Sequence, residues 1–257
     1  MKIAIIGHTG FIGNYLTNEF RKKYKVSRHS LRNIDFQKEY KKNLINIFSA
    51  DVIINCAAAL NPKTYNDNFI NQYLVNEILK LNKKFKKVVI HLSTINVLIE
   101  DRKDKYTKTK KICENLIKKH NKLFILRLPL IIQKKRGILE KKGEIKKIFN
   151  FLDSIKFTYC PFIFPGHSFN PVEIKIVKKI IEDIIKKKIK KKIINVKGSK
   201  KMNLYEIAEL VAKIQNKKLI RINCNKIFNL LPSYLQKYIK HRSNFIQQLA
   251  PIDNTKY

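Results

Sequence analysis

The chain has 257 residues and is poor in the residues that mark several protein classes: it contains no tryptophan, seven glycines, seven prolines and four cysteines. The cysteines lie far apart and include no CxxC pair, which argues against a disulfide framework or a zinc ribbon and fits a reducing cytosol. No apolar run reaches the roughly 18 residues of a membrane helix, because Arg127 interrupts the longest one. The apolar start, MKIAII, is too short for a signal peptide. We therefore expect a cytoplasmic protein with no membrane span.

Acidic side chains are also scarce: 19 Asp and Glu face 55 Lys and Arg, so the formal net charge is +36. A charge of this size raises the question of a nucleic-acid partner. The lysines are spread along the whole chain, however, and the densest runs fall near expected helix ends, where cations complement the helix dipole. We expect a solvated basic surface and no nucleic-acid partner. The six histidines show no metal-ligand spacing, and we expect no metal.

Short apolar runs alternate with helical patterns through the first two-thirds of the chain, which is typical of a parallel sheet with helices on both faces. We expect an α/β fold with a doubly wound parallel (Rossmann) sheet and a small C-terminal substrate lobe. The expected strands are residues 2–6, 24–28, 51–56, 87–92, 123–128 and 191–196. The expected helices are residues 12–22, 37–48, 66–83, 106–119, 141–153, 173–188, 203–214 and 226–239.

Two domains are expected from this order of elements. Residues 1–130 would form the dinucleotide-binding Rossmann core. Residues 131–257 would form a discontinuous smaller substrate lobe, from which elements such as residues 191–196 return to the core sheet. The stretch 158–171 contains Gly and Pro and is interpreted as the one long loop.

Three of the seven glycines stand close together in the segment GHTGFIG, directly after the first expected strand. Gly7 would allow the tight turn, Gly10 would let the backbone approach a pyrophosphate, and Gly13 would permit close packing of helix on strand. The N-terminus of the following helix would offer free N–H groups to the anion. A plain strand–helix turn is the alternative. The strand–turn–helix context, in a chain otherwise poor in glycine, predicts a dinucleotide site.

GHTGFIG resembles the GxxGxxG motif of the extended short-chain dehydrogenases/reductases, the group of nucleotide-sugar epimerases, dehydratases and reductases. The likeness continues in chain order and covers residues 1–130 well and the remainder loosely. DVIINCAAA resembles the strand that passes beneath the cofactor, Asn76 matches a helical Asn, and HLSTINV resembles the strand that delivers a catalytic Ser or Thr. YTKTK is a YxxxK motif followed by Glu114, and LRLP resembles the segment beside the nicotinamide.

Tyr106 and Lys110 are four residues apart and therefore share one face of an expected helix. An ammonium beside a phenol favours the phenolate, and a tuned tyrosine acts as general acid or base near neutral pH; a plain surface pair is the alternative. The resemblance implies that Tyr106 exchanges a proton with the substrate oxygen, that Lys110 holds the nicotinamide ribose, and that Thr94 hydrogen-bonds the same substrate oxygen. The alternatives are Ser93 in this last role, or a Thr94 hydroxyl that only caps a turn.

The segment after the second expected strand bears on the choice of cofactor. An acidic residue there would hold the ribose hydroxyls of NAD, but the chain offers Arg28, Ser30 and Arg32, donors suited to the 2′-phosphate of NADP. We therefore favour NADP over NAD. Asp35 is a candidate adenine contact or else the N-cap of the next helix. The expected cofactor-binding residues are Gly7, Thr9, Gly10, Phe11, Ile12, Gly13, Arg28, Ser30, Arg32, Asp35, Ala57, Ala58, Asn76, Tyr106, Lys110 and Pro129.

Three features depart from the family pattern. The connection from Thr94 to Tyr106 is shorter than in most relatives, where it helps to form the substrate pocket. Ile95 and Asn96 stand where the dehydratases have Asp-Glu, which argues against a 4,6-dehydratase. After LRLP the chain reads LIIQKKRG and lacks the usual Asn and Gly-Pro that lead into the sugar-nucleotide pocket. The sugar therefore stays open.

These observations together predict an NAD(P)-dependent reductase or epimerase that acts on a nucleotide-linked sugar by hydride transfer, in the synthesis of surface-polysaccharide precursors. The expected helices 66–83 and 106–119 would pair with a second copy and give a homodimer. Two alternatives are a non-catalytic NAD(P)-binding or redox-sensing protein of the same fold, and an accessory subunit of a larger assembly recruited by its basic surface.

Overall fold

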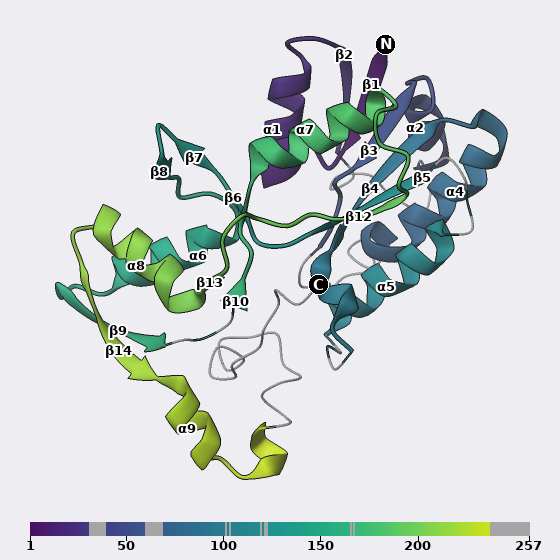
Figure 1. The fold of residues 1–257 in the computed structure, drawn as a ribbon. Coiled ribbons are helices and arrows are strands. Elements are labelled where there is room, and N and C mark those ends of the chain that lie inside the picture. The colour runs from purple at the N-terminus through teal and green to yellow at the C-terminus, as the bar shows by residue number, and fades with distance from the viewer. Residues whose placement is uncertain are drawn as a thin grey trace. The chain divides into compact units, whose positions relative to one another are not determined.

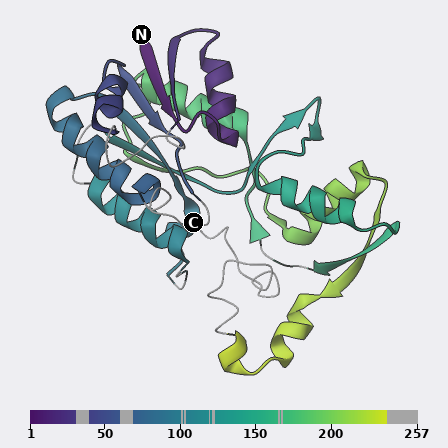
Figure 2. The same ribbon diagram turned by 180° about the vertical axis from the view of Figure 1, so that it is seen from behind.

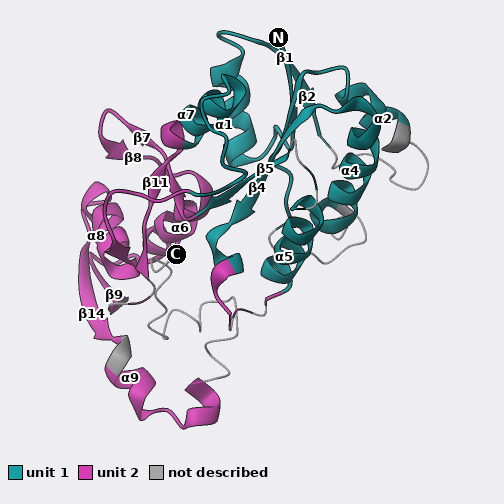
Figure 3. Cartoon of the chain, turned by 45° about the vertical axis from the view of Figure 1, so that its right-hand side comes forward, with its two compact units in different colours: residues 1–97, 105–128, 177–195 teal, residues 98–104, 129–176, 196–257 magenta. Residues whose placement is uncertain are grey.

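The computed structural model describes residues 1–30, 40–59, 69–100, 102, 104–118, 120, 123–164, 166 and 168–236. The chain divides into two compact units, which Figure 3 colours separately. Unit 1 consists of Met1–Val97, Lys105–Leu128 and Val177–Asn195. Unit 2 consists of Leu98–Asp104, Pro129–Ile176 and Val196–Tyr257.

The centre of unit 1 is a parallel sheet in the strand order β12-β5-β4-β3-β1-β2, which confirms the predicted α/β fold class. Its inner strands are apolar and buried because helices cover both faces. The order reverses at β1, which pairs with β2 on one side and with β3 on the other. Ligands of such sheets bind outside the carboxyl ends of the strands, at this switch point. The strands are β1 Lys2–Ile6, β2 Lys25–His29, β3 Val52–Asn55, β4 Val88–Thr94, β5 Leu123–Leu128 and β12 Ile193–Asn195.

Helices cover the two faces of this sheet, as Figures 1 and 2 show from opposite sides. One face carries α2 (Tyr40–Ile47), α4 (Leu74–Phe85) and α5 (Lys105–Ile117), whose apolar residues form a continuous core with β1, β3, β4 and β5. The other face carries α1 (Phe11–Phe20) and α7 (Ile174–Ile185). The Lys178 ammonium of α7 lies 3.8 Å from the Glu19 carboxylate of α1.

The elements of unit 1 follow the predicted ones with shifts of a few residues at their ends. The helix expected over 66–83 consists, where it is described, of the π-helical turn η1 (Phe69–Tyr73) followed by α4. A short 3₁₀ turn, η2 (Ile95–Leu98), follows β4.

Unit 2 has a second apolar core between two helices and a pair of strands. The helices α6 (Lys146–Ser154) and α8 (Leu204–Ile214) pack with the parallel strands β9 (Tyr159–Phe164) and β14 (Lys218–Asn223). Asn203 and Glu206 form a capping box that begins α8. The shorter elements are β6 Ile131–Ile132, β7 Lys134–Lys135, β8 Ile138–Leu139, η3 Gly143–Ile145, β10 Ser168–Phe169, β11 Val172–Glu173, β13 Met202–Asn203 and α9 Cys224–Leu230.

The prediction of one long loop over residues 158–171 is wrong. Most of that stretch is strand: β9 pairs with β14, β10 with β13, and β11 begins directly after it. The Gly and Pro residues suggested a loop, but Pro161 lies in a two-stranded sheet, where one edge of each strand needs no donor.

Candidate functional site

The glycine turn after β1 has a geometry that only glycine permits at two of its three glycines. Gly7 has a φ of +79°, and a Cβ atom there would meet the Ala57 backbone at 2.8 Å. A Cβ atom at Gly13 would lie 2.2 Å from the Gly7 carbonyl oxygen, so helix α1 packs directly on the turn. The Gly7 N–H donates to the His29 carbonyl oxygen at 2.9 Å and thereby joins the ends of β1 and β2.

Gly10 differs from these two, because no contact with the described residues requires a glycine at this position. Its φ is −75°, and among the described residues a Cβ atom would meet only the Gly7 oxygen, at 3.4 Å, which is ordinary contact. Gly10 is also the N-cap of α1, which has no side-chain cap and no acidic residue in its first turn. An uncapped helix N-terminus beside an open backbone is a suitable place for a phosphate group. This region therefore fits the pyrophosphate of a dinucleotide.

The loop after β3 is held by two buried amides. The Asn55 side-chain oxygen accepts a hydrogen bond from the Ala57 N–H at 3.1 Å. Asn71, on η1, bonds both the N–H and the carbonyl of Ala59, each at 2.7 Å. Sequence reasoning named Asn76, which is half-buried on α4, and missed Asn71. The one available signal was a polar residue inside the apolar run FINQYLV.

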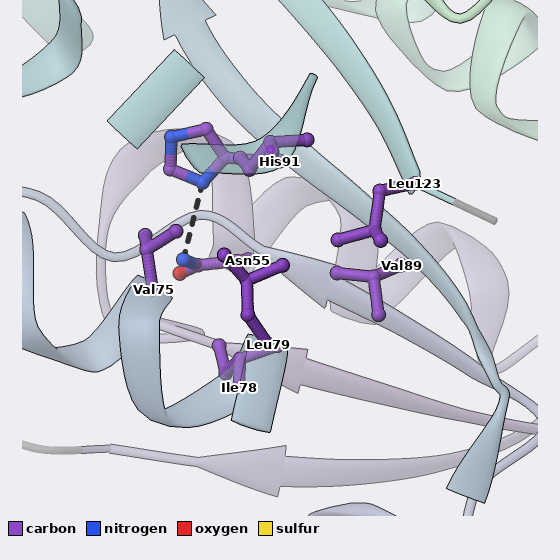
Figure 4. A pocket seen from close by; sticks show the side chains of 8 residues that line it. Asn55, Val75, Ile78, Leu79, Val89, His91 and Leu123 are labelled. Carbon is purple, nitrogen blue, oxygen red and sulfur yellow. Dashed lines mark hydrogen bonds between the residues drawn. The ribbon is translucent and has the colours of Figure 1, made fainter. Parts of the chain in front are cut away.

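Asn55 also fixes the protonation of His91, which lies directly opposite on β4 (Figure 4). Because the Asn55 oxygen is occupied by Ala57, its NH₂ group donates to His91 Nδ1, at 3.2 Å, and the imidazole proton is on Nε2. Burial, with a smaller effect of the Lys110 charge, lowers the pKa of His91 well below its usual value. The neighbouring cavity of about 10 Å³ is otherwise apolar, so it is no more than water-sized and offers few polar partners to a ligand.

Lys110 is almost fully buried, with 1% of its surface exposed. Its ammonium group donates to the Leu92 carbonyl oxygen at 2.9 Å and lies 5.8 Å from the centre of the Tyr106 ring. Burial lowers the pKa of Lys110. The structure thus brings Lys110 and Tyr106 together, with the lysine held on the strand that ends at Thr94.

Two cysteines face the same ammonium but are not nucleophiles. Burial raises the pKa of the Cys56 thiol to about 12 and that of the Cys113 thiol to about 11. Both are therefore neutral thiols near pH 7, and the thiolate is the reactive form. Cys113 donates to the Asn71 carbonyl oxygen at 2.9 Å, a structural contact between α5 and η1.

The hydroxyls of Ser93 and Thr94 have different surroundings. Ser93 Oγ donates to the Glu114 carboxylate at 2.6 Å inside the protein. Thr94, the last residue of β4, only accepts a weak bond from the Asn96 N–H, at 3.3 Å. The Thr94 hydroxyl proton has no acceptor among the residues that the structure describes. This difference favours Thr94 over Ser93 as a group that meets a substrate.

Glu114 and Arg127 form a buried ion pair behind these residues. The Arg127 guanidinium donates to both carboxylate oxygens, with Nη2 2.5 Å and Nε 3.0 Å from Oε2. Asn195 on β12 accepts a longer bond of 3.4 Å from the same guanidinium. The network ties α5 to β4, β5 and β12 and so fixes the helix that carries Tyr106 and Lys110.

The predicted cofactor residues of unit 1 differ in accessibility. Those exposed are Thr9, Arg28 and Ala58; those half-buried are Gly7, Gly10, Phe11, Ile12, Ser30, Asn76 and Tyr106; those buried are Gly13, Ala57 and Lys110. Pro129 directly follows β5 and belongs to unit 2. Arg32 and Asp35 lie outside the described residues.

Two other kinds of site were sought over the described ranges. No three His, Cys, Asp or Glu side chains gather there as a metal site would require. No helix in that part of the chain is long and apolar enough to cross a membrane.

Three of the solved structures with a similar fold are named as enzymes that act on dTDP- or UDP-linked sugars. dTDP-4-dehydrorhamnose reductase from Bacillus anthracis, in complex with NADP, has 17% identity and a TM-score of 0.69, over 88% of this chain and 85% of that one. dTDP-glucose 4,6-dehydratase from Bacillus anthracis, in complex with NAD, has 15% identity and a TM-score of 0.66, over 97% of this chain and 94% of that one. UDP-glucuronic acid 4-epimerase from Bacillus cereus has 18% identity and a TM-score of 0.66, over 87% and 86%.

The chain shares the Rossmann-type α/β fold of these reductase, dehydratase and epimerase structures. No family model matches its sequence, and no curated protein does. At this level of sequence identity the similarity establishes the fold alone. The shared fold confirms the Rossmann architecture that the glycine motif predicted. The roles of Tyr106, Lys110 and Thr94, and of the cofactor residues, stay predictions.

Proposed function

We propose that this chain is an NAD(P)-dependent reductase or epimerase of the short-chain dehydrogenase type that acts on a nucleotide-linked sugar. The observation that carries the proposal is the buried Lys110 ammonium, held on the Leu92 carbonyl oxygen beside the Tyr106 ring. Burying a charge there costs free energy that a methionine or leucine would not. A chemical role for the Lys110 charge would explain why a lysine stands at this buried position.

The cofactor proposal is supported by the glycine turn. Gly10 leaves open backbone at an uncapped helix N-terminus, which suits a pyrophosphate, and Asn55 and Asn71 fix the adjoining loop. Arg28, exposed on β2, and Ser30, directly after it, are donors for a 2′-phosphate, so we favour NADP over NAD. When bound, the nicotinamide would supply a hydride to a carbonyl carbon or remove one from a carbinol carbon.

The residues of the chain handle the proton that accompanies the hydride. In the reducing direction the Tyr106 hydroxyl would donate its proton to the substrate carbonyl oxygen. The Lys110 charge stabilises the resulting phenolate, and the Thr94 hydroxyl donates a hydrogen bond to the same substrate oxygen. Solvent then returns a proton to Tyr106. In the oxidising direction the same phenolate accepts the proton.

The substrate class is supported by the structural neighbours, which include a dTDP-sugar reductase and a UDP-sugar epimerase. Ile95 and Asn96, in the turn after Thr94, carry no carboxylate for an elimination, which disfavours dehydration. A place in the synthesis of surface-polysaccharide precursors, in the cytoplasm, follows from this substrate class.

The test uses NADPH or NADH with a panel of dTDP- and UDP-linked sugars and 4-keto sugars. Products are identified by mass spectrometry and NMR, and cofactor binding is followed by nicotinamide fluorescence. We expect turnover of at least one sugar, lowered by a factor of about 10² or more in Tyr106→Phe, with NADPH binding retained. Tyr24→Phe, in the turn between α1 and β2, is the matched control. Equal turnover in Tyr106→Phe would refute the proposed site, and NADPH binding without any turnover would favour the non-catalytic alternative.

A homodimer through η1, α4 and α5 is part of the proposal. Tyr73 on η1 and Ile112 on α5 are large apolar side chains that are 50% and 41% exposed. Sedimentation equilibrium should give twice the chain mass, and Ile112→Glu should shift it to the monomer. A monomeric wild-type protein at micromolar concentration would contradict this part.

A further inference from the structure

A second cavity opens at the opposite edge of the sheet, where β3, β4 and β5 begin. It has a volume of about 620 Å³, and all of its lining residues belong to unit 1. It is lined by Asp51 before β3, by the entry to β4, by Phe124 on β5, and by the segment between α7 and β12. The lining residues are Asp51, Lys86, Lys87, Val88, Phe124, Ile184, Lys187, Ile189, Lys190 and Lys192.

The charge of this cavity is one-sided. Five lysines line it against a single carboxylate, Asp51, which accepts a hydrogen bond from the Lys2 backbone N–H at 2.8 Å. None of the five lysines forms an ion pair with any residue that the structure describes. The formal lining charge is therefore +5 − 1 = +4, and no ion pair with a described residue compensates it.

Helix ends account for only part of this charge. Lys86 and Lys187 stand just past the last turns of α4 and α7, where a cation complements the helix dipole. Lys87 directly follows the C-cap of α4, whereas Lys190 and Lys192 lie beyond the end of α7, in the segment that leads into β12. Neither Lys190 nor Lys192 forms an ion pair with a residue that the structure describes, and the Lys192 ammonium contacts the Phe124 ring.

The wall of the cavity is apolar beneath the charges. The Phe124 ring forms part of it, and the Lys192 ammonium lies 4.3 Å from the centre of that ring. Val88 and Ile189 are partly exposed beside it. An aromatic ring and aliphatic groups under a set of ammonium groups suit a ligand with a planar or apolar part and several negative charges.

We propose that this cavity, the polyphosphate pocket, binds a small organic polyphosphate of the size and charge of a nucleoside triphosphate. Its volume lies within the range of small-molecule sites, roughly 300–1,000 Å³. About four negative charges on the ligand would match the net lining charge. The proposal is independent of the proposed enzymatic function, since the pocket is at the amino ends of the strands and the glycine turn is at their carboxyl ends.

The experiment is a calorimetric titration of the full chain with ATP at an ionic strength of about 0.15 M, with and without saturating NADPH. We expect ATP to bind in both cases. The pair Lys190→Glu/Lys192→Glu should weaken it by about tenfold or more, because two attractions become repulsions. The matched control, Lys25→Glu/Lys42→Glu, changes the net charge equally at exposed positions outside the pocket, and it should leave the affinity within about threefold.

Several outcomes would overturn the proposal. These are the absence of ATP binding, equal weakening in both double variants, and loss of ATP binding when NADPH is present, which would place ATP at the glycine turn. If tripolyphosphate binds as tightly as ATP, the pocket does not recognise the organic part of the ligand, and the proposal of an organic polyphosphate is wrong. A single-stranded oligonucleotide that binds tighter than ATP, and depends on Lys190 and Lys192, would replace the proposal with a nucleic-acid site.

Circular dichroism and thermal melting check that each variant is folded. If Lys190→Glu/Lys192→Glu does not fold, Lys190→Gln/Lys192→Gln takes its place and should still weaken ATP several-fold. Failure of NADPH to bind leaves the ATP measurement intact, so the two proposals fail separately.

Discussion

The Lys110 ammonium donates a hydrogen bond of 2.9 Å to the backbone carbonyl oxygen of Leu92. This bond joins α5 to β4 two residues before Thr94, so one contact positions both the helix of Tyr106 and the strand of Thr94. A lysine is not needed to fill this space, because the stem alone would pack. The proposed role of Lys110 therefore rests on its charge, which a variant without the ammonium group can test.

Lys110→Met should separate these two roles. The lost hydrogen bond and the relieved desolvation of the ammonium act in opposite directions, so the free energy of unfolding should change by less than about 1 kcal/mol. NADPH affinity should fall about tenfold or more, as for loss of a charged hydrogen bond. Urea unfolding and fluorescence titration measure the two, with Lys108→Met on the exposed face of α5 as control. A stability loss of several kcal/mol with unchanged NADPH affinity would make Lys110 structural.

Removing one partner of the buried pair of Glu114 and Arg127 should lower the free energy of unfolding strongly, whereas replacing both partners by apolar residues should lower it little. Glu114→Gln leaves the guanidinium buried without its counter-charge and should cost about 3–5 kcal/mol of unfolding free energy in urea. The double variant Glu114→Leu/Arg127→Met removes both charges and should recover most of that loss. If the double variant is no more stable than Glu114→Gln, the ion pair stabilises the fold beyond the mutual compensation of its two charges.

Gly10→Ala and Gly13→Ala should behave differently although the glycines are three residues apart. A methyl group at Gly13 would overlap the Gly7 oxygen, at 2.2 Å, and should cost at least about 2 kcal/mol. At Gly10 it has room, so stability should fall by less than about 1 kcal/mol, while NADPH affinity drops at least about tenfold through collision with the pyrophosphate. Thermal melting and NADPH titration decide. Unchanged affinity in Gly10→Ala would argue against a pyrophosphate there.

His91 should make the protein less stable in acid. Its pKa in the folded state is well below 6.5. Below about pH 6.5 the unfolded chain therefore binds a proton that the folded chain does not, and the free energy of unfolding decreases as the pH is lowered. The slope from this group approaches about 1.4 kcal/mol per pH unit. Urea unfolding between about pH 7 and pH 5 should show this extra slope in the wild type and not in His91→Gln. Because both proteins share His29, which also has a lowered pKa, parallel curves would contradict the assignment to His91.

Local patterns predicted much of unit 1. Apolar runs such as residues 2–6 and 123–128 are long enough to be buried strands wherever the chain folds, and a glycine triplet after the first strand restricts the backbone locally. Unit 2 was less predictable, because β9 and β14 are separated by more than fifty residues and each is stabilised by the other. The Gly and Pro of the 158–171 segment concealed a strand that only its partner explains.

The sequence by itself determined the strand–turn–helix of Gly7, Gly10 and Gly13 and the four-residue spacing of Tyr106 and Lys110, since both depend on backbone geometry within a few residues. Tertiary structure alone decided that Lys110 is buried, that Asn71 holds the loop, that Ser93 is engaged by Glu114, and that lysines from distant segments share one cavity. Each of these depends on which side chains the parallel sheet places next to one another. Burial and charge compensation are properties of that arrangement, and no local pattern encodes them.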